Sequence, residues 1–426
     1  MAEIVFEEKQ VSKKLTASAL QLTLIISLII TIILGSLIYL YSFYRQQDSK
    51  IQHQDRLLNL ITSGFELSKS VYLSPSDTVW ADVLYAGDSL RVQKENWGLY
   101  DKVTLTAIYQ HDSIKRAFLL GLESIDSTVL YVSDEDRNLS VSGRTTIIGT
   151  AYLPQAGIKP AFVDGKFFDG KEEIIEGKKK FSERALPAID KQRLQPLTEG
   201  LDSSTFLSPS MLQFSQHFRS FKEPTQYVYS EAALWLSNQA IEGNIMLSSD
   251  TLIHITADCT LEHIICIAPT IRVDKGFRGS VQLFATDSLI VGDEVHLSYP
   301  SALVLFAEDE EFRRALKIGK DGSIAGSVLL YEEKRSSVPH MLSLGENSLV
   351  TGELIAFGML KYTKPLTVRG STYCYRFITQ TPSSLYENFL IDINLDRSAR
   401  HPFFLQSYAW QKEEKNVPNS ILTWLE

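Results

Sequence analysis

The chain has 426 residues, of which 44% are hydrophobic and 22% charged, and its formal net charge is −9. This composition excludes a wholly disordered chain, a collagen-like chain and a small disulfide-stapled protein, and it leaves room for one membrane segment and two or three folded parts. The 42 Lys and Arg residues are outnumbered by 51 Asp and Glu residues. General nucleic-acid binders need clustered positive charge, so we expect no nucleic-acid partner.

The strongest single signal is an uncharged, aliphatic stretch from Leu15 to Tyr44. At 1.5 Å per residue a helix of this length crosses a hydrocarbon core of about 30 Å, which predicts one transmembrane helix over residues 15–44, in contact with the lipid bilayer. The stretch ends in aromatic residues and Arg45, as is typical of a membrane interface. A cleaved signal peptide is the alternative, but its apolar region usually spans about 7–15 residues.

Basic residues flank this segment on both sides, so the positive-inside rule does not orient it. A short head over residues 1–14 and a much larger body favour a cytoplasmic tail, an inner (cytoplasmic) membrane anchor, and a body in the periplasm or outside the cell. The three cysteines, Cys259, Cys266 and Cys374, do not decide the compartment, because a large body needs no disulfide framework.

Residues 45–70 are expected to continue the membrane helix as a stalk. Apolar residues recur there at helical spacing, at Ile51, Leu58, Ile61 and Phe65. This stripe predicts packing on the chain's own body or, alternatively, self-association.

Short apolar runs separated by turn signals predict a small β or α+β domain close to the membrane over residues 71–173, with a helix near residues 114–121. The charged, proline-containing text that follows predicts a connector over residues 174–235. It contains Lys178, Lys179 and Lys180, which could contact an anionic surface but are more typical of a solvated face.

The C-terminal half repeats a unit of an apolar residue, any residue, Gly, a small or polar residue and another apolar residue. Its glycines are Gly243, Gly279, Gly326, Gly352 and Gly370. Stacked coils with glycine corners produce such a repeat, so we predict a β-solenoid, similar to a right-handed β-helix, over residues 236–382. A β-sandwich is the competing fold.

The inward-facing residues predicted for this solenoid are Val273, Val281, Val291, Leu303, Ile318, Val328, Leu344 and Leu354. The remaining residues, 383–426, are rich in aromatics and are expected to form a cap or tail. Phe403, Phe404 and Trp410 could alternatively dock a partner. The predicted fold class is therefore mainly β, with an N-terminal transmembrane and stalk helix.

The texts IRVDKGFRGSVQLFATDSLIVG and LKIGKDGSIAGSVLLYEE resemble the coils of bactofilins, which are polymer-forming bacterial β-helix proteins. More broadly, KKLTASALQLTLIISL, ENWGLYD and GTAYLPQAGIKPAFVDGKFF resemble a group of bacterial single-pass membrane proteins that brings no known activity. Bactofilins lack a large domain between membrane and solenoid, so filament formation does not follow from the resemblance. The apolar N-terminal helix also resembles that of pilins, although their Gly-[FM]-x3-Glu processing site is missing.

Catalytic and phosphate-binding motifs do not occur: there is no G-x-S-x-G elbow, no G-x-x-x-x-G-K-[ST] loop and no G-x-G-x-x-G turn. His254, Cys259, His263 and Cys266 could be read as four zinc ligands, but their spacing is not that of a zinc knuckle. Alternatively, Cys259 and Cys266 form a disulfide, or they are small buried core residues. We prefer burial in the core.

Two acidic runs, at residues 134–136 and 308–311, lack the alternating spacing of calcium loops and predict solvated turns. A polysaccharide-cleaving solenoid would need convergent carboxylates on neighbouring coils. The nearest candidates are Asp274, Asp293 and Glu294, with Arg272 and Arg278.

The sequence thus predicts a membrane-anchored structural or adhesive protein of the bacterial envelope, non-catalytic and without cofactor or metal. Self-association or envelope proteins would be its partners. A minor pilin-like component and a polysaccharide-active enzyme are the alternatives.

Overall fold

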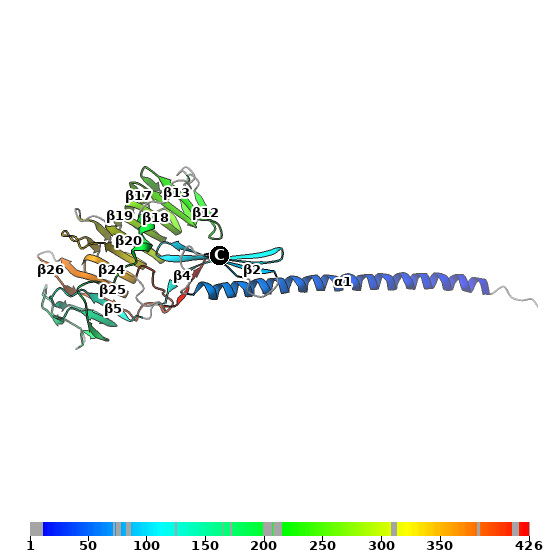
Figure 1. Cartoon of the computed structure of the whole chain (residues 1–426), viewed down its shortest axis with the longest axis horizontal. Helices are drawn as coiled ribbons and strands as arrows, with labels where there is room; N and C mark the ends of the chain where they lie inside the picture. Colours follow the sequence, from blue (N-terminus) through cyan, green and yellow to red (C-terminus); the bar gives the residue numbers. More distant parts are fainter. Residues whose placement is uncertain are drawn as a thin grey trace, which may run out of the picture.

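In the computed structural model, the described residues are 12–70, 73, 78–81, 87–123, 126–163, 165–170, 173–198, 207, 215–307, 313–380, 384–410 and 417–425. They form a mainly β body and one long N-terminal helix, as predicted. Figure 1 shows the helix projecting from one side of the body.

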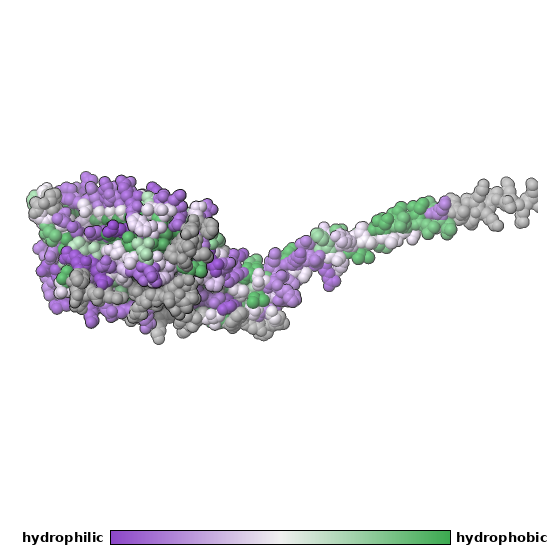
Figure 2. All heavy atoms as spheres, turned by 90° about the horizontal axis from the view of Figure 1, so that it is seen from above, coloured by the Kyte–Doolittle hydropathy of each residue, from purple (hydrophilic) through white to green (hydrophobic). Residues whose placement is uncertain are grey.

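Helix α1 runs unbroken from Ser12 to Ser68. Its residues 20–44 carry exposed Leu, Ile and Tyr side chains, and the helix is long and apolar enough to cross a membrane. Figure 2 shows this apolar surface on the part of the helix far from the body. The surface of the body is mostly hydrophilic.

The stalk prediction is right about the helix but only partly right about its packing. Ile61 and Phe65 pack on the body together with Leu60, whereas Ile51 and Leu58 are exposed. The buried stripe is therefore confined to the last turns of α1, where the helix meets the body.

The sheet at the base of α1 is antiparallel, with the strand order β1-β2-β3-β4-β29. Its strands are β1 (Thr78–Ala81), β2 (Asp88–Trp97), β3 (Tyr100–Tyr109), β4 (Asp112–Leu122) and β29 (Asn419–Trp424). The C-terminal strand thus completes a sheet that the N-terminal part of the chain begins.

The helix expected near residues 114–121 is wrong, because this segment is strand β4 and pairs with β3. Phe118 and Leu120 pack toward α1, while Ala117 and Leu119 pack toward the rest of the body. Both faces of the strand are covered, so its sequence is an unbroken apolar run that periodicity alone cannot assign.

A second sheet is parallel over most of its length, and its strands pair with parallel strands that follow later in the chain. Part of it closes into a barrel of six parallel strands. In chain order its central strands are β12 (Gln216–Arg219), β13 (Gln226–Ser230), β14 (Leu234–Leu236), β15 (Ala240–Gly243), β16 (Ile245–Ser249), β17 (Leu252–Ile255), β18 (Thr260–Val273), β19 (Arg278–Val291), β20 (His296–Ala307), β21 (Ala315–Ile318), β22 (Ser323–Glu332), β23 (Met341–Leu344), β24 (Ser348–Tyr362) and β25 (Leu366–Gln380). We call these strands, with those that extend them below, the parallel stack. Parallel pairing does not fit the β-sandwich alternative.

The parallel stack does not end at β25, because strands from much earlier in the chain continue it. Strand β5 pairs in parallel with β25, and β7 pairs with β28. The added strands are β5 (Thr128–Val132), β7 (Thr146–Ile148), β8 (Thr150–Leu153), β10 (Ile175–Glu176), β11 (Lys179–Phe181), β26 (Leu385–Glu387) and β28 (Ile393–Asp396). Strands β6 (Leu139–Ser142), β9 (Ile158–Pro160) and β27 (Phe389–Ile391) form a separate three-stranded parallel sheet, whose Leu139, Val141 and Leu390 pack in the same core. The ladder therefore reaches beyond both limits of residues 236–382, and includes strands expected in the membrane-proximal domain and the connector. In Figure 1 it runs from β12 and β13 through β18–β25 to β5, across the direction of α1.

All eight residues predicted to face inward are buried in one continuous cluster inside the parallel stack. Gly326, Gly352 and Gly370 occupy paired positions on successive strands. Each has positive φ, and a Cβ on Gly352 would lie 2.0 Å from the carbonyl oxygen of Gly326. Glycine is thus required at these corners by both conformation and close approach.

One lateral side of the parallel stack is covered by the chain itself. Phe284, Val304 and Leu329 on that side form a cluster with Leu99 and Leu119 of the antiparallel sheet. Helix α2 (Lys191–Thr198) and the tail after β28 also cover this side.

Candidate functional site

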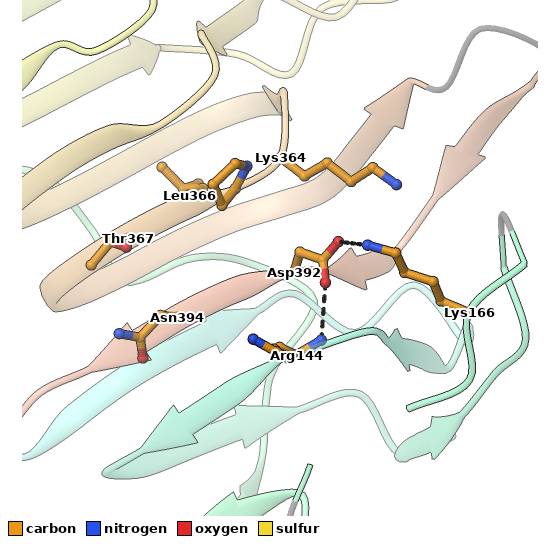
Figure 3. Close-up of a pocket in the computed structure, with 8 residues that line it drawn as sticks. Arg144, Lys166, Lys364, Leu366, Thr367, Asp392 and Asn394 are labelled. Atoms are coloured by element: carbon orange, nitrogen blue, oxygen red, sulfur yellow. Dashed lines mark hydrogen bonds and ion pairs between the residues drawn. The ribbon is translucent and has the colours of Figure 1, made fainter. Parts of the chain in front are cut away.

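A pocket of about 440 Å³ lies at a corner of the last coils of the parallel stack. Its lining comes from the beginnings of β25 and β28 with the turns before them, from the turn between β6 and β7, and from the segment after β9, which are far apart in sequence (Figure 3). The lining residues are Arg144, Lys166, Lys364, Pro365, Leu366, Thr367, Asp392 and Asn394.

Asp392 is the central polar group of this pocket. Lys166 Nζ lies 2.9 Å from Asp392 Oδ2, and the backbone N–H of Arg144 donates to Oδ1 at 3.0 Å. Burial alone would raise the pKa of Asp392, but the Arg144 N–H and Lys166 outweigh it, so the pKa lies below its ordinary value. The carboxylate is therefore ionised at neutral pH. It holds the segments that contain Arg144 and Lys166 close together.

Gly143 explains why these segments can meet. It has a φ of +61°, and a Cβ on it would lie 2.2 Å from Asp392 Oδ1. Any larger residue would push the carboxylate away from the Arg144 N–H.

The pocket has an excess of positive charge, because Arg144, Lys166 and Lys364 face one carboxylate. Among the described residues, the exposed Arg144 side chain forms an ion pair with Asp169, at 3.7 Å. Asn394 adds an amide, whose Oδ1 bonds the Thr146 hydroxyl. Cations and an amide around an open pocket suit recognition of a small anionic group, such as a carboxylate or a phosphate.

The carboxylates considered for polysaccharide cleavage lie on neighbouring turns of the parallel stack. Asp274 Oδ1 lies 2.8 Å from His254 Nε2, Asp293 accepts the Lys320 N–H at 2.9 Å, and Glu294 pairs with Lys275 at 2.9 Å. Each is tied to its own partner along one corner of the parallel stack.

The two arginines of that set are separated. Arg272 lies on the last part of β18 beside His254, and Arg278 begins β19 beside His296. These two positions are on different sides of a coil.

The four residues considered for zinc do not form a common site, and the described part of the chain contains no metal-binding cluster of His, Cys, Asp and Glu. Cys266 points into the core, and burial raises the pKa of its thiol to about 12. His254 instead faces outward, against Trp235. Cys259, Cys266 and Cys374 are all buried and none forms a disulfide, as the preferred reading expected.

The acidic run at residues 134–136 forms ion pairs with distant segments of the chain. Glu135 pairs with both Arg335 and Arg376, and although burial opposes it, these two arginines lower the pKa of the carboxyl. Asp136 pairs with Arg184 at 3.1 Å. The second acidic run, residues 308–311, lies outside the described residues.

Lys179 and Lys180 belong to β11, a strand that pairs on one side only, with β8, among the described strands. Lys180 Nζ donates to the Tyr152 hydroxyl at 2.9 Å. The cluster is therefore at an edge of the parallel stack.

The tail aromatics divide between packing and exposure. Phe404 is only 6% exposed, whereas Phe403 is 82% exposed. Trp410 Nε1 donates to Glu353 Oε1 at 2.8 Å, and the Ser407 hydroxyl donates to Glu353 Oε2 at 2.7 Å. The tail thus packs along the side of the parallel stack, anchored on a buried carboxylate.

Sequence reasoning missed the pocket, because Arg144, Lys166, Lys364 and Asp392 share no motif and no spacing. The one local signal is Gly143, in the text VSGRT, which indicates a tight turn. Comparisons with protein-family models, curated proteins and solved structures found no match.

Proposed function

We propose that this protein is a membrane-anchored, non-catalytic binding or assembly scaffold of the bacterial envelope, with a β-solenoid body of the right-handed β-helix type. The observation that supports this most is the in-register parallel pairing of successive coils, with their corner glycines in one row. A stack of this kind offers long, straight lateral faces for a partner. The resemblance of two segments to bactofilin coils is also part of the support for this proposal.

The position of α1 adds to the argument. Because the parallel stack runs across the direction of α1, a helix that crosses the membrane presents the lateral faces of the body along the membrane surface (Figure 1). We propose that residues 15–44 lie in the inner membrane and that the body lies outside the cytoplasm.

One end of the parallel stack favours binding over polymerisation. At one end Phe168 packs against the core together with Ile158 and Ile174. The edge strand β11 carries Lys179 and Lys180, and lysines on an edge strand oppose further strand pairing. A scaffold that does not polymerise end to end therefore fits better than a bactofilin-like filament.

The pocket around Asp392 favours an anionic partner. Its cations are arranged for recognition, and its carboxylate is already engaged by Lys166 and Arg144. A group engaged in this way serves to position the binding site rather than to transfer protons.

Orientation is tested with reporters fused after residue 426 in living cells. We expect alkaline phosphatase to be active there and a cytoplasm-dependent fluorescent protein to be dark. The reverse pattern would place the body in the cytoplasm and overturn this part of the proposal.

The binding role is tested by crosslinking the full-length protein in intact envelopes and identifying what it captures. Purified full-length protein in detergent is then incubated with envelope polysaccharides, and we expect binding without release of reducing or unsaturated sugars. Sugar release that disappears in Asp274→Asn or Asp293→Asn would instead establish the enzyme alternative. Capture of pilus or secretion components would establish the pilin-like one.

A further inference from the structure

One lateral face of the parallel stack carries a straight row of outward side chains. The row runs over β14, β17, β18, β19, β21, β23 and β24, through positions that pair directly from strand to strand. Its polar and aromatic members are Trp235, His254, Arg272, Lys317, Ser343 and Lys361, with Ile290 between Arg272 and Lys317. We call this the basic row.

The cations of the basic row are regularly spaced. Arg272, Lys317 and Lys361 occupy every second strand, because Ile290 and Ser343 lie between them. Neighbouring strands are about 4.8 Å apart, so successive cations are separated by roughly 10 Å. A straight ligand with one negative charge per similar distance would meet all three.

Asp274, which lies 2.8 Å from His254, brings one carboxylate to the beginning of the basic row. The parallel row of outward positions beside the basic row holds Leu252, Thr270, Ser288, Ala315, Met341 and Met359, so neither row contains a carboxylate. Among the described residues, Arg272 and Lys317 form no ion pair or hydrogen bond, and both are exposed. Their charge is therefore available to a ligand.

The basic row begins with an aromatic platform. Trp235 is 60% exposed, and its ring lies 4.4 Å from the ring of His254. His254 is held by Asp274 at 2.8 Å, which fixes the surface against which Trp235 rests. An exposed indole face is suited to stacking on the apolar face of a sugar ring.

The two rows together make a strip with apolar residues between the cations. Ile290, Met341 and Met359 are half-buried. Strand β26, which pairs with the end of β25 next in the ladder, lies on the side of the body away from α1 (Figure 1). The end of the strip next to β26 thus lies far from the membrane anchor, which disfavours a lipid surface as its ligand.

From this spacing, charge and aromatic platform we infer that the basic row binds an extended acidic polysaccharide with a carboxylate on every second sugar. Two sugar rings of an extended chain span about the same length as two strand spacings. The inference deepens the proposed function, on which it rests, by naming the chemical class of the partner.

Binding is measured with full-length protein in detergent micelles and three probes: hyaluronan, which has alternating carboxylates, neutral dextran, and vesicles containing anionic phospholipid. The test variant carries Arg272→Gln, Lys317→Gln and Lys361→Gln. The matched control carries Lys178→Gln, Lys320→Gln and Arg369→Gln, which remove the same charge from exposed positions outside the row.

We expect the native protein to bind hyaluronan in preference to dextran and vesicles, with an affinity that falls as salt is raised. The test variant should lose about tenfold in affinity, as expected for three exposed ion pairs, and the control variant less than about twofold. Trp235→Ala should weaken binding without changing its salt dependence.

Equal losses in the test and control variants, preference for vesicles, or no hyaluronan binding at all would each overturn the inference. None of these results would refute the scaffold itself, which is judged by the reporters and by envelope crosslinking. Cleavage of hyaluronan would refute the non-catalytic function.

Discussion

The parallel stack and the antiparallel sheet at its side are both β structure, but they are held together differently. In the parallel stack each strand pairs with parallel neighbours, and aliphatic residues such as Val328 and Leu354 form a core inside the stack. The antiparallel sheet has no interior of its own, and packs Leu60 of α1 on one face and the parallel stack on the other. The parallel stack is therefore stabilised by its own core, whereas the antiparallel sheet is stabilised by packing against α1 and the parallel stack.

The two regions also depend on chain order in different ways. The central strands of the parallel stack pair with strands nearby in the sequence, whereas β29, near the C-terminal end, pairs with β4. Loss of a few residues at the C-terminus should thus affect the antiparallel sheet far more than the parallel stack.

The largest effect is expected from a charge placed inside the parallel stack. Val328→Asp buries a carboxylate without a partner and should cost roughly 4–5 kcal/mol or more, unfolding several coils. Thr351→Asp puts the same group on a half-buried outward position beside Arg369 and should cost less than about 1 kcal/mol. Urea unfolding followed by circular dichroism measures both, and similar losses would mean that the predicted inward and outward positions are not distinct.

The next effect tests the junction between the two regions. Glu353 is fully buried and accepts hydrogen bonds from Ser327, Ser407 and Trp410. Glu353→Gln replaces one acceptor oxygen by a donor and should cost about 2–3 kcal/mol. Hydrogen exchange should rise over residues 397–410 before it rises in β22 or β24.

The matched control for this junction is Glu333→Gln, which removes only the exposed ion pair with Lys191. We expect it to cost less than about 1 kcal/mol. If both variants left the tail equally protected, Glu353 would not be its anchor.

A smaller effect is expected in the antiparallel sheet. The Trp424 ring lies 5.1 Å from Phe118 and 6.3 Å from Phe65, but it is half exposed. Trp424→Ala should cost about 1–2 kcal/mol and increase hydrogen exchange in β4 and the last turns of α1. Hydrogen exchange in the parallel stack should not change. Phe181→Ala, at an exposed position on β11, is a control that should also leave the parallel stack unchanged. An equal response of both regions would argue that they unfold as one unit.

The smallest effect concerns pH at the pocket. Because the folded-state pKa of Asp392 is lowered, its contribution to stability is present above the ordinary carboxyl pKa of about 3.9 and is lost as pH falls through the lower folded value. Its ion pair with partly exposed Lys166 contributes roughly 0.5–1 kcal/mol. The unfolding free energy of native protein, compared with Asp392→Asn, should differ by that amount at pH 7 and not at pH 2. A difference that persists at pH 2 would have another origin.

Sequence alone determined the features that depend on local pattern. The uncharged run made α1 recognisable, since a helix that lies in lipid needs apolar residues on all sides. The glycines at 326, 352 and 370 and the inward aliphatic residues were found for a similar reason, because each coil repeats the same local demands on backbone and side chain.

Tertiary structure alone decided which distant segments meet. Nothing in residues 128–181 indicates that they extend a ladder ending at residue 380, because unpaired strand edges accept any matching strand irrespective of its place in the chain. Strand β4 was mistaken for a helix because coverage on both faces removed its alternation. The pocket around Asp392 exists only where three such segments converge, so its residues carry no spacing that a sequence could reveal.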